Sequence, residues 1–228
     1  MDDKDLNLCR DLRGYFAECG AEASPQSITA LQDQVAQGGS SVKHVIIPSG
    51  LQALWHVAAE WHLYSNHFNI LGLNIFPPEK VIAMTKNVFG DEDNMETWKL
   101  QVSQGQDTSC AHDGWVCIGS ISDYDYIFTN VDADSPHHGD TRHMVNNCTN
   151  ETLLTKSPFS NFLLRLDGLV RSAREMLEMK EPESIWGNIM ARTNEEEVEK
   201  LQEKLNEKIY YFMTRRNLSI DDLSLDLA

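Results

Sequence analysis

Four aspartates around one apolar segment are the residues of this chain whose types and spacing most resemble a binding site. They are Asp123, Asp125, Asp132 and Asp134, and the segment 124–131 has the aromatic and β-branched composition of a strand. We expect the four carboxylates to gather near one hairpin end. Turns explain each aspartate singly, but together they predict a negatively charged face that attracts a basic partner and speeds its association.

Histidines next to these aspartates are metal-ligand residue types, because imidazole and carboxylate both bind Zn²⁺. The residues concerned are His137, His138 and His143, beside Asp132, Asp134 and Asp140. Their spacing matches no known zinc motif, and loop histidines are more often simply exposed. We therefore expect no metal and keep a metal-dependent hydrolase that uses this loop as an alternative.

Patterns for other catalysis are absent from the sequence. There is no G-x-S-x-G nucleophile motif, no phosphate-binding glycine loop, and no cysteine in a recognised catalytic context. Cys117 alternates with apolar neighbours, which predicts a buried and unreactive thiol. We expect a protein that is not an enzyme and has no cofactor.

The charge balance favours a basic protein partner. Among 228 residues, 19 Lys and Arg stand against 35 Asp and Glu, for a formal net charge of −16. Such a field repels nucleic acid and anionic membranes. The hydrophobic content of 41% is enough for a packed core.

Cysteine usage and the first residues predict a cytoplasmic protein. Five cysteines without a C-x-x-C pair suit neither a disulfide framework nor a zinc ribbon. The segment 1–5 is charged, and no apolar run reaches the roughly 18 residues of a membrane span.

Apolar spacings of three and four predict helices, and capping residues mark their starts. We expect helices over residues 5–19 with Gly20 as the stop, from Ser24-Pro25, after Pro48, after Pro78, from Ser157-Pro158, and from Asn194. Strands are expected in a hairpin over 61–70 and at 115–119, 124–131 and 142–145. Short connections between the last three predict a β-meander. The fold class is therefore α+β, with a mixed or antiparallel sheet packed against helices and with N- and C-terminal helical extensions.

Three features have two interpretations each. Trp115 is either a core residue or an interface anchor, since Trp is enriched at binding hot spots. Gly119 either relieves crowding or forms a bulge. The apolar stripe over Val198–Phe212 either packs on the domain or mediates homodimerisation through the C-terminal helix.

The chain resembles the Smi/Knr-like family of the SUKH superfamily in four pieces, in this order: Ile47-Pro48 followed at once by a helix, Trp115-x-x-Ile118-Gly119 running into Tyr126-Ile127-Phe128, the turn from Asp132 to Gly139, and Ser157-Pro158-Phe159. The resemblance covers more than half of the chain. It places a core domain at 24–179, an N-terminal extension at 1–23, and a C-terminal extension with an acidic tail at 180–228.

This resemblance implies a domain without catalytic activity. Many bacterial members are similar to immunity proteins of toxin–antitoxin systems, which neutralise a toxin domain, often a nuclease, by binding it. Other members are regulatory or scaffold proteins. For this chain we predict stoichiometric binding of a basic toxin domain, with a regulatory adaptor as the alternative. The predicted contacts are Trp115, Asp123, Asp125, Asp132 and Asp134.

Overall fold

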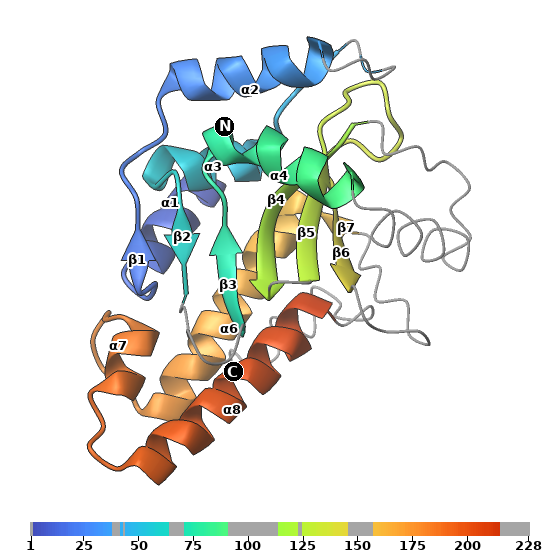
Figure 1. Cartoon of the computed structure of the whole chain (residues 1–228). Coiled ribbons are helices and arrows are strands. Elements are labelled where there is room, and N and C mark those ends of the chain that lie inside the picture. Colours follow the sequence, from blue (N-terminus) through green and yellow to red (C-terminus); the bar gives the residue numbers. More distant parts are fainter. Residues whose placement is uncertain are drawn as a thin grey trace.

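The fold is α+β, with one antiparallel sheet between helices. The computed structural model describes residues 2–37, 42, 44–63, 71–90, 114–122, 125–145 and 157–214. In this part of the chain seven strands form a single open sheet in the chain order β1-β2-β3-β4-β5-β6-β7 (Figure 1). The strands are β1 (Glu18–Cys19), β2 (Trp61–His62), β3 (Leu71–Ile75), β4 (Trp115–Ser122), β5 (Asp125–Asn130), β6 (Asp140–Val145) and β7 (Ser157–Pro158). Every neighbouring pair is antiparallel, which confirms the predicted meander.

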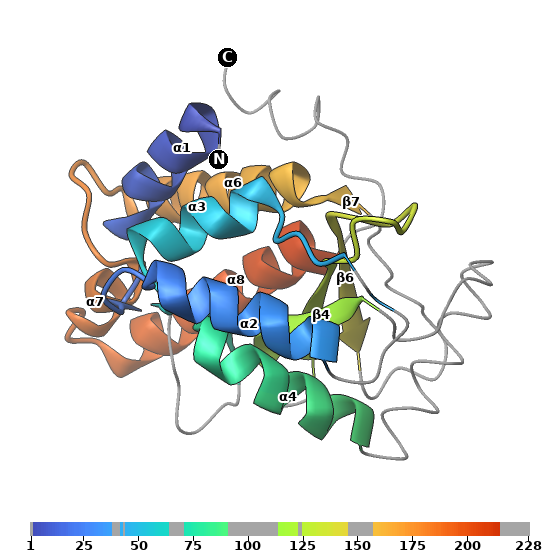
Figure 2. The ribbon, with the colours of Figure 1, turned by 90° about the horizontal axis from the view of Figure 1, so that it is seen from above.

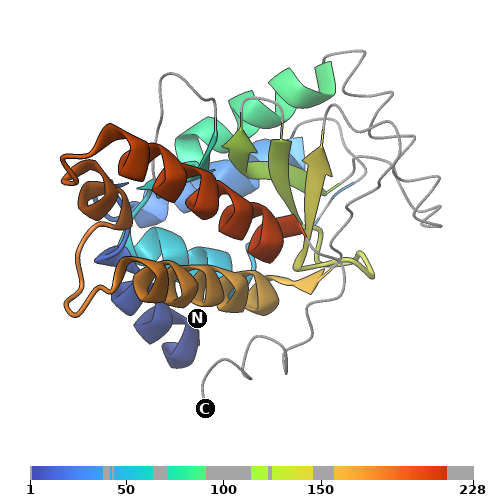
Figure 3. The same ribbon diagram turned by 90° about the horizontal axis from the view of Figure 1, so that it is seen from below.

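Helices lie on both sides of this sheet. They are α1 (Asp3–Arg13), α2 (Pro25–Gln37), α3 (Ser49–Val57), α4 (Pro78–Gly90), α6 (Phe159–Leu177), α7 (Ile185–Met190) and α8 (Glu195–Thr214). Seen from above, α4 and α6 lie on opposite sides of the strands (Figure 2). Seen from below, α8 runs beside α6 (Figure 3), and the two helices are in contact.

Two of the predicted helix starts carry the expected side-chain caps. Ser24 Oγ accepts a hydrogen bond of 3.0 Å from the backbone N–H of Ser27 at the start of α2. Asn194 Oδ1 accepts one of 3.1 Å from the N–H of Glu196 in α8. These bonds satisfy donors that the first helical turn leaves without a partner.

The first helix is shorter than its apolar spacing predicted. It ends at Arg13, and Gly20 is not its stop. Tyr15 and Phe16 are buried in the turn that follows, where the Phe16 ring meets Trp61 edge-on at 5.2 Å between centroids. A turn that packs on the core satisfies the same apolar spacing as another helical turn, which is why periodicity alone extended the helix too far.

Ser157-Pro158 does not open α6 as predicted. The two residues form β7, which pairs with Asp140 and Thr141 of β6, and the helix begins at Phe159. The residue before a proline is driven to extended backbone, so the dipeptide suits a short strand as well as a cap. The predicted hairpin partner at 68–70 lies outside the described residues, and β3 begins at Leu71.

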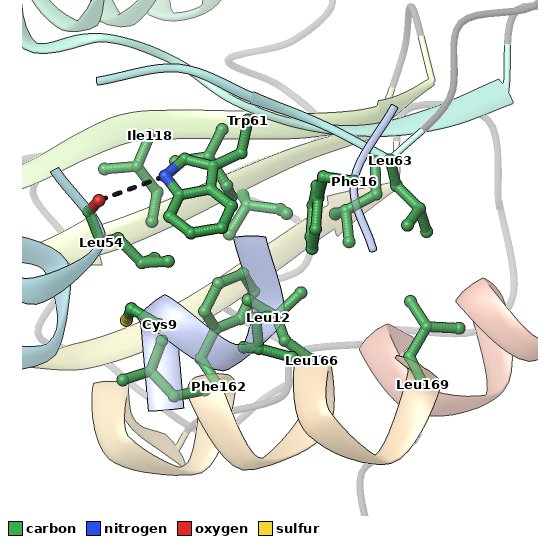
Figure 4. Close-up of a cluster of buried hydrophobic side chains, with 14 of the residues drawn as sticks. Cys9, Leu12, Phe16, Leu54, Trp61, Leu63, Ile118, Phe162, Leu166 and Leu169 are labelled. Carbon is green, nitrogen blue, oxygen red and sulfur yellow. Dashed lines mark hydrogen bonds between the residues drawn. The ribbon is translucent and has the colours of Figure 1, made fainter. Parts of the chain in front are cut away.

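The core is divided by the sheet, because alternate residues of a strand face opposite sides. Val116 and Ile118 of β4 face the larger cluster, which also contains apolar residues of α1, α3, α6 and α8 (Figure 4). Trp115 and Cys117 face a smaller cluster with Val88 of α4. Each fully buried large apolar side chain contributes about 1.5–3 kcal/mol. The larger cluster contains Leu6 and Leu12 of α1 as well as Leu205 and Ile209 of α8. Residues of the predicted N- and C-terminal extensions therefore pack into the same core as the central segment.

A bulge in β4 depends on Gly119. A Cβ at this position would lie 2.2 Å from the carbonyl oxygen of Asn74, and the β4–β5 register shifts between Cys117 and Gly119. Both predicted roles of this glycine are confirmed. The N–H of Cys117 at the bulge donates to Thr85 Oγ1 of α4 at 2.9 Å, so that the helix satisfies a buried backbone donor of the sheet.

Candidate functional site

The predicted aspartates do not gather at one hairpin end, so that expectation was wrong. Asp125 is the first residue of β5, whereas Asp132 and Asp134 follow its last residue. A strand rises about 3.3 Å per residue, which places Asp125 and Asp132 roughly 20 Å apart. Asp123 lies outside the described residues. The aromatic and β-branched composition of this segment predicted the strand, but the carboxylates were assigned to one end of it without allowing for its length.

Asp125 is a buried residue that holds the C-terminal helix. It is 6% exposed, and its Oδ2 accepts a hydrogen bond of 2.7 Å from the hydroxyl of Tyr210 in α8. A hydrogen bond to an ionised group is stronger than one between neutral groups. A carboxylate occupied in this way is a structural anchor, and it is not presented on the surface for a partner.

Trp115 is a core residue. It is 2% exposed and packs with Val88, Cys117 and Phe128. The guanidinium carbon of buried Arg142 lies 4.3 Å from the centre of its ring, in a cation–π contact. The structure therefore supports the interpretation of Trp115 as a core residue over that of an interface anchor.

The second pair of aspartates lies on an ordered loop. Asp132 Oδ1 accepts a hydrogen bond of 3.1 Å from the N–H of Asp134, and the N–H of Asp132 donates to Asn130 Oδ1 at 3.0 Å. Such side-chain bonds are typical of aspartate and asparagine in tight turns. Gly139 has a φ of +78°, and its N–H donates to the carbonyl oxygen of Asn130 at 2.9 Å. Positive φ favours glycine.

A second segment, residues 44–47, is fastened along this loop. The N–H of Ile46 donates to the carbonyl oxygen of Val131 at 2.9 Å, and the N–H of Ala133 donates to that of His44 at 2.8 Å. The loop 131–140 together with residues 44–47 is called the loop platform below. Cross-strand hydrogen bonds restrain both of its segments before any partner arrives.

The loop platform carries one exposed apolar side chain and one exposed carboxylate. Ile46 is 39% exposed, and it is one of three large hydrophobic residues exposed in the described part of the chain. Asp134 is 73% exposed at its side chain, and its Oδ1 lies 3.8 Å from Nδ1 of the exposed His44. The arrangement combines an exposed apolar side chain with a solvated negative charge, which suits binding to another molecule.

The two loop histidines whose side chains the structure describes, His137 and His138, are not arranged as metal ligands. Buried His137 has its Nδ1 3.2 Å from Asp140 Oδ2, and the Nε2 of His138 lies 3.0 Å from the carbonyl oxygen of Ile46. The side chain of His143 lies outside the described residues. Within these limits no three His, Cys, Asp or Glu side chains gather as they would around a metal ion.

Burial suppresses thiol chemistry at the cysteines that the structure describes. Burial raises the pKa of Cys117 to about 12, that of Cys9 to about 12 and that of Cys19 to about 11. The thiolate is the reactive form. All three are free thiols, and the predicted inertness of Cys117 is consistent with its complete burial.

Comparison of the chain with models of known protein families finds no match, and comparison with curated proteins finds none either. Among the helices of the described segments, none has the length and apolar content needed to cross a bilayer.

Two important residues had no signal in the sequence. Tyr210 is 85 residues from its partner Asp125, and Arg142 meets Trp115 only through sheet register. Ile46 was likewise not among the predicted contacts, and its exposure became evident only from the packing of the loop platform.

Proposed function

We propose that this chain is a non-catalytic protein-binding domain whose loop platform contacts a basic partner, and that the partner is a toxin domain of the nuclease type neutralised by stoichiometric binding. The observation that carries the proposal is the exposed pair Ile46 and Asp134 on a hydrogen-bonded support. A restrained surface loses less conformational entropy when it binds. The sequence resemblance supplies the toxin as the partner class.

Charge supports a basic partner. The net charge of −16 creates a field that steers cationic surfaces toward the chain. Asp134 adds a local negative charge on the same loop platform as exposed Ile46. An interface with a desolvated centre and a charged rim gains both affinity and association rate. A nuclease toxin needs a positively charged surface to hold its nucleic acid, so it fits this description.

The structure revises the contacts within this proposal. Asp132 and Asp134 remain in the partner-binding set, and Ile46 joins them. Asp125 and Trp115 act through the fold instead, because both are buried. A regulatory adaptor would use the same surface, and it differs in having a partner without toxic activity.

The test begins with capture of partners from the native host at low salt and elution by rising salt. Association of the eluted protein is then measured with the wild type and with Asp134→Lys. We expect the association rate at low ionic strength to fall roughly threefold or more, because charges at an interface rim act mainly on this rate. Salt should reduce the difference, since the Debye length is only about 10 Å at 0.1 M.

A matched control separates the local charge from the net charge. Glu203→Lys, at an exposed position of α8, changes the total charge by the same amount. Helix α8 lies apart from the loop 131–140 in Figure 1. The association rate of this variant should stay closer to that of the wild type. Equal rates for the two variants contradict the assignment of the surface. An eluted partner that has no toxic activity, or whose activity survives a stoichiometric amount of the chain, supports the adaptor instead.

A further inference from the structure

Every backbone carbonyl oxygen of residues 44–47 accepts a hydrogen bond. That of His44 accepts from the backbone N–H of Ala133 at 2.8 Å. The other three accept from side-chain nitrogens, in the pairs Val45 with Gln32 Nε2 at 3.2 Å, Ile46 with His138 Nε2 at 3.0 Å, and Ile47 with Gln52 Nε2 at 2.8 Å. This short segment of the loop platform is therefore held at each of its residues.

The three side-chain donors come from three different parts of the fold. Gln32 lies in α2, Gln52 lies in α3, and His138 lies in the loop 131–140. The segment 44–47 makes an isolated bridge to Asp132 and is not one of the named strands of the sheet. Side chains thus supply hydrogen bonds that a strand in a sheet receives from the backbone of its neighbour.

Chemistry fixes the direction of these bonds. A carbonyl oxygen can only accept, so Nε2 of His138 carries the hydrogen, and the amide nitrogens of Gln32 and Gln52 point at the segment. The neutral imidazole with its hydrogen on Nε2 and the doubly protonated ring both meet this requirement. The contact of His138 with Ile46 is therefore a hydrogen bond from ring to backbone in either form.

Burial does not require the bond that His138 makes. His138 and Ile46 are both exposed, where water can hydrogen-bond to a backbone carbonyl, and holding an exposed side chain in one orientation costs conformational entropy. The bonds from Gln32 and Gln52 are partly buried, where a carbonyl needs a protein partner. His138 is therefore the donor whose bond is explained by fixing the position of Ile46 more than by satisfying the fold.

The backbone of Ile46 is tied down on both sides of its side chain. Its N–H donates to the carbonyl oxygen of Val131 at 2.9 Å, and its carbonyl oxygen accepts from His138 at 3.0 Å. The exposed side chain of Ile46 therefore projects from a fixed backbone. A contact residue that is already in its bound orientation loses less conformational entropy when the partner arrives.

We propose that His138 is a positioning residue of the loop platform: its Nε2–H fixes the backbone of Ile46, so that the Ile46 side chain meets the basic partner in its bound orientation. The inference rests on the proposed function and deepens it. His138 acts through Ile46 and not by contacting the partner.

The first measurement uses the free full chain labelled with ¹⁵N and reads the backbone order parameter of Ile46. A rigid backbone gives about 0.85, and values below about 0.6 indicate flexibility. We expect the wild type near the upper value and His138→Ala well below it. In His138→Gln the amide Nε2 is as many bonds from Cα as the ring Nε2, so this variant should restore the order. His56→Ala, at an exposed histidine of α3, is the control and should match the wild type.

The second measurement uses the partner eluted from the native host in the test of the proposed function. His138→Ala should raise the Kd for that partner about threefold to tenfold, because Ile46 then has to be ordered on binding. His138→Gln should recover most of this loss. In an Ile46→Ala chain the change His138→Ala should add little, since a residue that acts through Ile46 has no side chain left to position. The midpoint of urea unfolding should stay unchanged in His138→Ala, because His138 is exposed.

The inference is overturned if His138→Ala leaves the order parameter of Ile46 at the wild-type value, or if it loosens Ile46 without raising the Kd. A loss of affinity that persists in full in the Ile46→Ala chain also overturns it, since His138 would then contact the partner itself. The proposed function fails separately, through equal association rates for Asp134→Lys and Glu203→Lys, whereas the order parameter of Ile46 is measured without any partner.

Discussion

The hydroxyl of Tyr210 donates a hydrogen bond of 2.7 Å to Oδ2 of Asp125, and this bond joins the end of the last described helix to the start of β5. Nearby, Arg165 Nη1 of α6 donates to the carbonyl oxygen of Phe212 at 2.8 Å. On α8 itself, the buried apolar side chains include Leu205, Ile209 and Phe212. The apolar stripe of α8 is therefore packed against its own chain. This favours packing on the domain over homodimerisation through this helix.

Removal of the Tyr210 hydroxyl should destabilise the fold. In Tyr210→Phe a buried carboxylate loses a donor, and a hydrogen bond to a charged group contributes about 1.5–3 kcal/mol. We expect a lower free energy of unfolding by that amount in urea denaturation. Tyr15→Phe is the control, because the Tyr15 hydroxyl makes no hydrogen bond within the described segments while its ring is buried like the core around it. A change within about 0.5 kcal/mol is expected there, and equal losses for the two variants would refute the anchoring role.

The hydroxyl of Thr85 should stabilise the fold, because it accepts the hydrogen bond from the N–H of Cys117. Thr85→Val keeps the shape of the side chain but leaves the N–H of Cys117 without its acceptor. Loss of a partner for a buried donor costs about 1–3 kcal/mol. Thr85→Ser, which retains the acceptor, should lose less. Thermal unfolding of both variants measures this, and a Thr85→Val protein as stable as Thr85→Ser would contradict it.

Substitution by alanine should lower the stability of the fold at two glycines, Gly119 and Gly139, for different reasons. At Gly119 an added Cβ meets the backbone of β3, so we expect Gly119→Ala to lose roughly 3 kcal/mol or more, or to fail to fold. At Gly139 nothing lies within 4 Å of an added Cβ, and only the positive φ opposes it. That strain costs about 1–2 kcal/mol. Comparison of the two denaturation midpoints tests the ranking, and a milder effect at Gly119 would show that the bulge can relax.

Glu60 should contribute to stability in a way that depends on pH. Burial raises its pKa, but the hydrogen bond from Lys80 and the nearby His62 outweigh that effect, so its pKa lies below the ordinary value of 4.5. A depressed carboxyl pKa stabilises the fold above the unfolded pKa, and this contribution disappears as pH falls through the folded pKa.

The wild type should therefore exceed Glu60→Gln in unfolding free energy at pH 6, and the difference should shrink below about pH 4.5. Chemical denaturation across this range provides the measurement. A difference that stays constant down to acid pH would mean that the ion pair with Lys80 does not contribute.

Local chemistry made part of this structure predictable. Ser24 and Asn194 mark their helices because a cap acts over two or three residues. Gly119 was linked to crowding or a bulge for an equally local reason. The helix α7 was not predicted, since its six residues are too few for a recognisable period.

The sequence alone determined the α+β class, the antiparallel meander and most helix starts, because caps, prolines and apolar alternation act between residues close along the chain. Only the tertiary structure decided which side chains meet. It buried Asp125 under Tyr210, stacked Arg142 on Trp115, and separated the aspartates by the length of β5. Register and helix docking create these contacts between distant residues, and a short stretch of sequence carries no record of either.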